Sequence, residues 1–110
     1  MKSNEHVKIN KLKLIGSGTQ ADVYTCTVKS LIGGAAQYSG EATYVTKTKK
    51  IVDNFEIAND TFKSMYKEFK IAKNLKHPNV VRYMDFITKK SEKLCEFNII
   101  LEFLEGGNLR

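Results

Sequence analysis

Three groups of residues in this 110-residue sequence could together form a phosphate-binding site. The first is the stretch Gly16-Ser17-Gly18-Thr19-Gln20-Ala21, because glycines let a backbone approach a phosphate and offer N–H groups to it. The second is Lys47, a cation in a segment with strand character, and the third is Glu68, a carboxylate able to hold the lysine stem in place. The first two also have an ordinary explanation: the glycines turn a hairpin and Lys47 faces water.

The residues after the glycine stretch exclude two of the known phosphate-binding loops. A dinucleotide-binding fold needs a helix at this point, and a Walker loop needs Gly-Lys-Ser or Gly-Lys-Thr. Residues 21–28 are instead rich in β-branched and aromatic side chains, which predicts a strand. The remaining alternatives are a glycine hairpin that covers phosphates and a plain turn.

A helix over residues 60–76 is expected to position Glu68 on its N-terminal half. Its apolar residues recur at helical spacing, at Phe62, Met65, Phe69, Ala72 and Leu75. Asp60 is the expected N-cap, and Pro78 prevents the helix from continuing.

The other elements are expected to be strands, at residues 9–15, 21–28, 43–48, 80–87 and 96–103. The polar segment 88–93 is the expected connection between the last two. Strands joined by hairpins favour an antiparallel sheet, so we expect an α+β fold with a five-stranded antiparallel sheet and one major helix. The connection 29–43 could be an ordered hairpin extension or a mobile insertion.

Composition excludes several classes of protein. The net charge is +6, from 18 Lys and Arg against 12 Asp and Glu, and the lysines form three clusters that read as solvated faces, so we expect no specific nucleic-acid partner. Apolar runs are far shorter than the roughly 20 residues of a membrane helix, and residues 1–10 hold no apolar stretch like that of a signal peptide, so we expect no membrane partner.

The two cysteines, Cys26 and Cys95, form neither a metal-binding pattern nor a disulfide framework. Buried thiols in a reducing compartment are the simplest interpretation. We therefore expect a cytoplasmic protein, with the nucleus as the second possibility.

Taken together and in order, the motifs resemble the N-terminal, ATP-binding lobe of eukaryotic protein kinases. They are Ile15-Gly16-Ser17-Gly18 through Val23, Tyr44-Val45-Thr46-Lys47, Glu68, His77-Pro78-Asn79-Val80-Val81 and Leu101-Glu102-Phe103-Leu104-Glu105-Gly106-Gly107-Asn108-Leu109. The resemblance covers residues 9–110 and makes 1–8 an N-terminal extension. The hinge sequence 105–109 leans toward the NIMA-related and Ste20-like serine/threonine kinases.

The resemblance implies a role for each matching position. Lys47 would contact the α- and β-phosphates of ATP and would be held there by Glu68. The loop of Gly16, Ser17, Gly18, Thr19, Gln20 and Ala21 would close over the phosphates. Ile15 and Val23 would sandwich the adenine, with Val45 beside it. Leu101 matches the gatekeeper, Glu102 and Leu104 would bond the adenine edge through their backbones, and Asn108 would lie near the ribose. The turn at residues 77–79 would be structural.

The sequence departs from the family pattern at several of these positions. Ala21 replaces the third loop glycine and Gln20 the usual aromatic residue, so the loop would cover phosphates less tightly. Val45 replaces a smaller alanine, and Ala72 replaces a larger leucine or methionine. Lys49 has the same strand parity as Lys47 and is a rival for the phosphate contact, but that choice would put Lys47 unpaired in the adenine pocket.

The function implied is that of the ATP-binding lobe of a serine/threonine protein kinase. Arg110 follows directly after the hinge, so the catalytic base, the residues that hold Mg²⁺ and most of the protein-substrate site are expected in a C-terminal lobe. The 110 residues alone are expected to be inactive. The alternative is a pseudokinase or kinase-like interaction module, suggested by Ala21, Val45 and Ala72, and a third reading is a small basic nucleic-acid binder.

Overall fold

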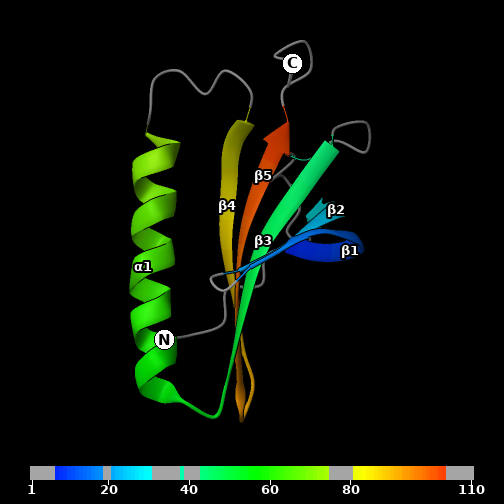
Figure 1. Ribbon diagram of the computed structural model, residues 1–110. Helices are drawn as coiled ribbons and strands as arrows, with labels where there is room; N and C mark the ends of the chain where they lie inside the picture. The colour runs from blue at the N-terminus through cyan, green and yellow to red at the C-terminus, as the bar shows by residue number, and fades with distance from the viewer. Residues whose placement is uncertain (1–6, 19–20, 31–37, 39–42, 75–80, 104–110) are drawn as a thin grey trace.

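A computed structural model describes residues 7–18, 21–30, 38, 43–74 and 81–103. It contains a five-stranded antiparallel sheet and one helix, which confirms the predicted α+β fold (Figure 1). The elements are β1 (Val7–Ser17), β2 (Asp22–Ser30), β3 (Thr43–Val52), α1 (Phe55–Lys73), β4 (Val81–Lys90) and β5 (Leu94–Phe103). The strand order in the sheet is β1-β2-β3-β5-β4, so β3 and β5 are central.

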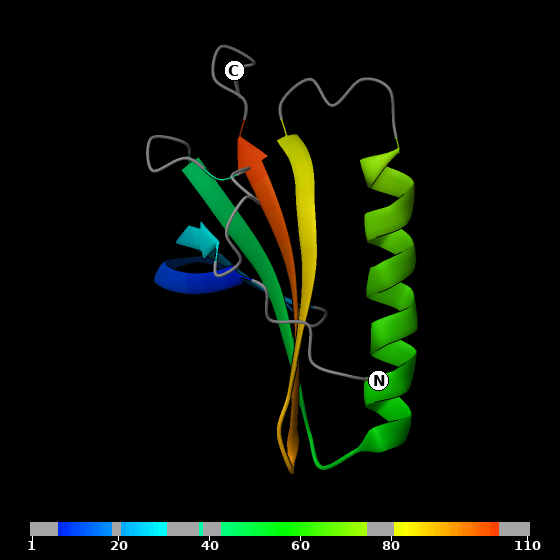
Figure 2. The ribbon, with the colours of Figure 1, turned by 180° about the vertical axis from the view of Figure 1, so that it is seen from behind.

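The helix and the first hairpin lie on opposite sides of the central strands. In Figures 1 and 2, α1 runs beside β4 on one side, while β1 and β2 run across the sheet on the other. Two hydrophobic clusters match these two sides. The sheet therefore has a helix face, covered by α1, and a hairpin face, covered by β1 and β2.

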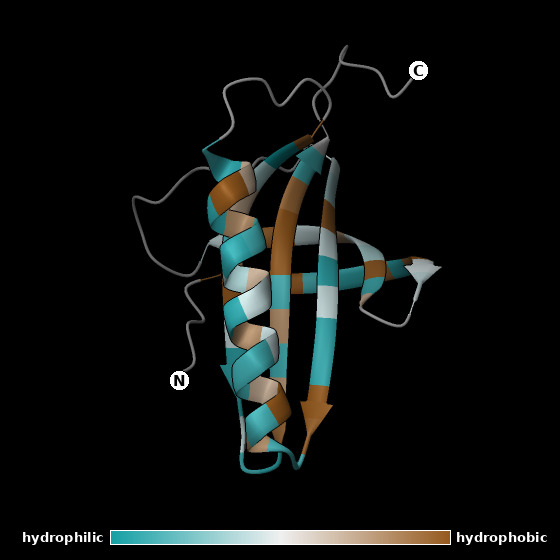
Figure 3. Cartoon of the chain, turned by 60° about the vertical axis from the view of Figure 1, so that its left-hand side comes forward, coloured by the Kyte–Doolittle hydropathy of each residue, from teal (hydrophilic) through white to brown (hydrophobic). Residues whose placement is uncertain are grey.

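Aromatic residues dominate the core on the helix face. Phe97, which is fully buried, lies with its ring centroid 6.4 Å from Phe86 and 6.1 Å from Phe62. Apolar and polar bands alternate along α1 (Figure 3), and the helix buries Ala58, Met65 and Phe69. This spacing packs one side of α1 against β4 and β5 and leaves the lysine-rich side in solvent.

The hairpin face has an aliphatic core. Val7 and Ile9 of β1 and Cys26 of β2 pack with Ile87 and Ile100. Cys26 and Cys95 are both buried and free. Burial raises the pKa of the Cys26 thiol to about 11, against the opposing effect of the Lys11 charge, so the thiol is protonated near neutral pH.

The helix begins earlier than the sequence predicted. Its N-cap is Asn54, whose Oδ1 accepts a hydrogen bond from the Ile57 backbone N–H at 3.0 Å, and not Asp60, which lies inside the helix. Phe55 and Ile57 in the first turn are exposed, so they do not extend the apolar stripe that marked the helix in the sequence. As a result Glu68 lies in the C-terminal half of α1, not the N-terminal half.

The last hairpin is also tighter than predicted. β4 extends to Lys90 and β5 begins at Leu94, so the first half of the expected connection 88–93 is strand. The backbone N–H of Ser91 donates to the Leu94 carbonyl at 2.8 Å and closes the turn. The predicted turn at 77–79 and the nature of most of the 29–43 connection lie outside the described residues. Within the described ranges no helix is long and apolar enough to cross a membrane.

Candidate functional site

Lys47 and Glu68, which lie 21 residues apart in sequence, form an ion pair on the helix face. Lys47 Nζ is 2.9 Å from Glu68 Oε2 and 3.2 Å from Oε1, so the ammonium group contacts both carboxylate oxygens. The two side chains are 34% and 37% exposed. Ion pairs at such exposure stabilise a fold by at most about 1 kcal/mol, so stability alone does not account for this one.

The two partners come from rigid elements. Lys47 lies in central strand β3, opposite Val23 of β2 and Ile99 of β5. Glu68 follows from the packing of α1, because the neighbouring Met65 and Phe69 are buried against the sheet. The pair therefore joins the helix to the middle of the sheet.

A tyrosine that the sequence interpretation did not single out also contacts Glu68. Tyr83 of β4 donates its hydroxyl to Glu68 Oε2 at 3.4 Å. Burial, followed by the charge and hydrogen bond of Glu68, raises the pKa of Tyr83, so the phenol remains a donor at neutral pH. The register of β4 shifts between Tyr83 and Asp85, and no signal in the sequence predicted this irregularity or the side to which Tyr83 points.

The glycine turn joins β1 to β2 beside this pair. The Gly18 backbone N–H donates to the Ala21 carbonyl at 3.2 Å, and Ser17 Oγ donates to Asp22 Oδ1 at 2.9 Å. A Cβ atom at Gly16 would lie 3.7 Å from Val23 Cβ, and one at Gly18 would lie 3.8 Å from the Ala21 carbonyl oxygen, which are ordinary contacts. Packing inside the fold therefore does not require glycine at either position. Thr19 and Gln20 lie outside the described residues.

A cavity of about 390 Å³ lies between the turn, β3 and α1. Its lining includes Ala21 from the turn, Lys47 and Lys49 from β3, and Met65 and Glu68 from α1. Lys49 also lines a neighbouring cavity of about 170 Å³, together with Gly18 and Asp22. The structure brings both candidate lysines to the cavity, and Lys47 is the one bonded to Glu68.

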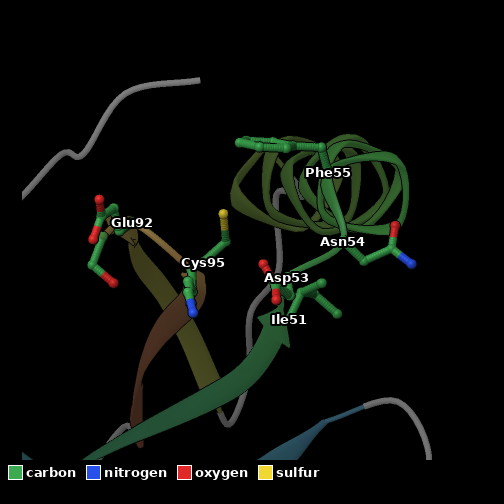
Figure 4. Close-up of a pocket in the computed structure, with 8 residues that line it drawn as sticks. Ile51, Asp53, Asn54, Phe55, Glu92 and Cys95 are labelled. Carbon is green, nitrogen blue, oxygen red and sulfur yellow. The ribbon is translucent and has the colours of Figure 1, made fainter.

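A third cavity, at the turn between β3 and α1, is too small for a nucleotide. It has a volume of about 20 Å³ and is lined by residues that include Asp53, Phe55 and Cys95 (Figure 4). A volume of this size holds about one water molecule. The cavity of about 390 Å³ beside Lys47 is the largest of the three and has room for a phosphate group.

The residues proposed to surround the adenine lie near one another around β3. Val45 is 4% exposed, pairs with Leu101 across the β3–β5 ladder and has the same strand parity as Lys47. Val23 lies across β2–β3 from Lys47, whereas Ile15 is 50% exposed.

Of the remaining predicted site residues, Glu102 lies near the end of β5. The Glu102 side chain is bonded to Arg82, which leaves the proposed role to its backbone. Leu104 and Asn108 lie outside the described residues. In the described ranges, no group of three His, Cys, Asp or Glu residues is arranged to hold a metal ion.

Comparison with known proteins agrees with these features. The protein kinase domain family matches residues 9–110. The mitogen-activated protein kinase kinase kinase ANP1 of Arabidopsis thaliana is 34% identical over 102 residues, which cover 90% of this chain and 13% of that protein. Mitogen-activated protein kinase kinase kinase 2 of the same plant is 34% identical over 106 residues, covering 94% and 14%. The cyclin-dependent kinase 7 of Dictyostelium discoideum is 31% identical over 93 residues, covering 84% and 24%.

The chain thus spans only a small part of the length of each of these relatives. The matched range includes the glycine turn, Lys47 and Glu68. The chain belongs to the protein kinase domain family.

Proposed function

We propose that this chain is the ATP-binding lobe of a serine/threonine protein kinase, which transfers the γ-phosphoryl group of ATP to a protein hydroxyl together with a C-terminal lobe. The observation that carries the proposal is the Lys47–Glu68 ion pair, at 2.9 Å, in a cavity bordered by the glycine turn. Kinase names among the relatives support the general class. The hinge sequence 105–109 supports a NIMA-related or Ste20-like group within it.

In this function Lys47 contributes positive charge to the α- and β-phosphates of ATP. A lysine has a flexible stem, so a carboxylate that contacts its ammonium group reduces the freedom that phosphate binding would otherwise have to restrict. Glu68 supplies that carboxylate, and Tyr83 bonds to one of its oxygens. Glu68 and Tyr83 therefore act through Lys47.

The glycine turn and the strands around β3 hold the rest of the nucleotide. Backbone N–H groups of residues 16–21 approach the phosphates. A Cβ at Gly16 or Gly18 would make only ordinary contacts within the fold, so internal packing does not explain these glycines, and this supports a role in close approach to a ligand. Ile15, Val23 and Val45 form apolar surface for the adenine, with Leu101 as gatekeeper. The backbones of Glu102 and Leu104 bond the adenine edge, and Asn108 lies near the ribose.

The chemistry of phosphoryl transfer needs groups beyond these residues. Mg²⁺, when bound, neutralises charge on the phosphates, and residues of the C-terminal lobe would hold it. The catalytic base and most of the substrate site belong to that lobe in the same proposal. The free, buried cysteines support a cytoplasmic or nuclear location.

Phosphoryl transfer by the protein that carries both lobes tests the proposal. Lys47→Met should lower kcat/KM by about 100-fold or more, as loss of a phosphate-contacting charge does in other enzymes. Lys49→Met, which changes a second lysine of the same cavity, should have a much smaller effect.

Other outcomes contradict parts of this account. A larger loss in Lys49→Met would reverse the assignment of the two lysines. No transfer by the unaltered two-lobed protein would favour the alternative, a pseudokinase or kinase-like interaction module, for which Ala21, Val45 and Ala72 are the motivating residues.

A further inference from the structure

The hairpin face of the sheet contains a connected set of buried polar side chains that the proposed nucleotide site does not use. Asn98, which is 0% exposed, accepts hydrogen bonds from Thr48 Oγ1 at 2.7 Å and Thr46 Oγ1 at 3.4 Å. Its Nδ2 donates to Glu96 Oε2 at 3.1 Å. Buried polar groups destabilise a fold unless they are bonded, and within the described residues no buried side-chain nitrogen or oxygen lacks a partner. These hydrogen bonds connect Thr46 and Thr48 through Asn98 to the carboxylate of Glu96.

Lys11 reaches this carboxylate from β1. Its Nζ lies 3.3 Å from Glu96 Oε2 and 5.2 Å from the ring centroid of Tyr24 on β2. Lys50 of β3 is a weaker neighbour, at 3.9 Å from Oε1 and 53% exposed against 24% for Lys11. Glu96, on β5, thus links the first hairpin to the two central strands.

The charge state of Glu96 favours this link. Burial alone would raise the pKa of Glu96, but the Asn98 amide and the charges of Lys11 and Lys89 lower it overall. The carboxylate is therefore ionised at neutral pH. Removing Lys11 takes the nearer cation away from Glu96, and neutralising Glu96 leaves Lys11 as a partly buried charge.

The position of Lys11 along β1 gives the pair its significance. Before Lys11, Val7 and Ile9 are buried in the core of the hairpin face. After it, Leu12, Leu14 and Ile15 are 61%, 49% and 50% exposed. The register with β2 is irregular between Lys11 and Lys13, and such irregularities bend a strand. Lys11 therefore lies where the packed part of the hairpin ends and the exposed part, which carries the glycine turn, begins.

We propose that Lys11 and Glu96 are positioning residues that fix the hairpin at this bend and so set where the glycine turn lies relative to Lys47. The inference rests on the proposed function, in which the turn covers the phosphates of a nucleoside triphosphate. Ala21, at the end of the turn, lines the same cavity as Lys47 and Glu68. A tilt of the hairpin at Lys11 therefore moves one wall of that cavity, although the pair itself does not contact the ligand.

Amide hydrogen exchange of the chain without nucleotide tests the positioning directly. In Lys11→Met and in Glu96→Gln, the amides of residues 16–18 and 21–23 should exchange at least fivefold faster, while those of Phe97 and Ile99 change less than twofold. Lys13→Met removes an exposed lysine from the same strand and is the matched control, with less than a twofold change throughout. The double variant Lys11→Met/Glu96→Gln should exchange no faster than the faster single variant, because the two residues act as a pair.

Two results of this experiment would overturn the inference. Exchange at the turn that is unchanged in Lys11→Met would show that the pair does not hold the hairpin. Equal acceleration in the turn and in β5 would show a purely general role in stability. Lys11→Arg, which keeps the charge, should restore the wild-type rate within twofold, and this rescue decides the question even if Glu96→Gln does not fold.

Titration of the two-lobed protein with ATP, followed by the NMR shift of the Lys47 amide, tests whether the position of the glycine turn affects ATP binding. Lys11→Met should raise the dissociation constant for ATP three- to tenfold, Lys11→Arg should restore it and Lys13→Met should leave it unchanged. Equal ATP affinity in Lys11→Met and wild type would contradict the positioning role. No ATP-dependent shift in the wild type would contradict the proposed function, and the exchange rates would then judge the Lys11–Glu96 pair by themselves.

Discussion

The two faces of the sheet place their charged residues in different surroundings. On the helix face, Lys47 and Glu68 are each about one-third exposed and border a cavity of about 390 Å³. On the hairpin face, Glu96 is 12% exposed at its side chain and is bonded to Asn98 and Lys11 within a closed polar set. One pair is open to a ligand, whereas the other is enclosed by the chain.

In our proposals, the charged pair on the helix face binds the ligand, and the charged pair on the hairpin face positions the strands. A charge that must meet a phosphate has to remain accessible, and its partner can only restrain it. A charge that holds two strands together gains from burial, provided that every polar group around it is bonded. The helix face then carries the proposed chemistry, and the hairpin face carries the support for the turn above it.

The largest expected effect is on the core of the helix face. Phe97→Ala should lower the free energy of unfolding by about 3–5 kcal/mol, because Phe97 is fully buried beside Phe62 and Phe86. Tyr66→Ala, which changes a 42% exposed ring of α1, should lower it by about 1 kcal/mol. Equal losses in urea denaturation would contradict a core centred on Phe97.

The polar set of the hairpin face should give the next largest effect. Asn98→Ala leaves Thr46, Thr48 and Glu96 without their shared partner, so the free energy of unfolding should fall by about 1–3 kcal/mol. Asn10→Ala, at an exposed position of β1, should change it by less than about 0.5 kcal/mol. A neutral result at Asn98 in the same denaturation measurement would mean that the set does not stabilise this face.

The start of α1 provides a smaller and more local test of the helix face. Asn54→Ala removes the hydrogen bond to the Ile57 N–H and should lower the free energy of unfolding by about 1 kcal/mol. Asp60→Ala, inside the helix, should change it by less than about 0.5 kcal/mol. Thermal unfolding followed by circular dichroism distinguishes the two, and a larger loss at Asp60 would restore the helix start that the sequence predicted.

Tyr83→Phe should have the smallest effect on stability, about 0.5 kcal/mol, because it removes one long hydrogen bond to Glu68. The variant also has a predicted pH signature. The pKa of Tyr83 is raised in the fold, so above pH about 10 the folded state holds more protons than the unfolded state and stability falls as pH rises. Tyr83→Phe should weaken this fall in denaturation measured from pH 8 to 11. An unaltered pH profile would contradict a raised pKa of Tyr83 in the folded state.

Much of the fold could be predicted because its local patterns agree with its tertiary structure. The spacing of Phe62, Met65 and Phe69 matches the side of α1 that is buried. The start of the helix could not be predicted in the same way, since Phe55 and Ile57 are apolar yet exposed. The burial of Glu96 and Asn98 in β5 could not be predicted from their polar side chains either, because the β1–β2 hairpin covers them.

For the candidate site, the sequence could suggest residue types but not their contacts. Lys47 and Glu68 could be chosen from motif order, with Lys49 as a rival for the phosphate contact, and the structure adds the contact between Lys47 and Glu68. Tyr83 could not be found because its direction depends on an irregularity in β4. Lys11 and Glu96 are far apart in sequence and belong to no motif.

The coupling between Lys47 and Glu68 is the most direct test of the central claim that they act as one phosphate-contacting unit. The measurement is kcat/KM for ATP of the two-lobed protein, compared among wild type, Lys47→Met, Glu68→Gln and the double variant. We predict that each single variant loses about 100-fold or more and that the double variant loses no more than the worse single one. Single variants within a few-fold of wild type, or losses that multiply in the double variant, would contradict the claim.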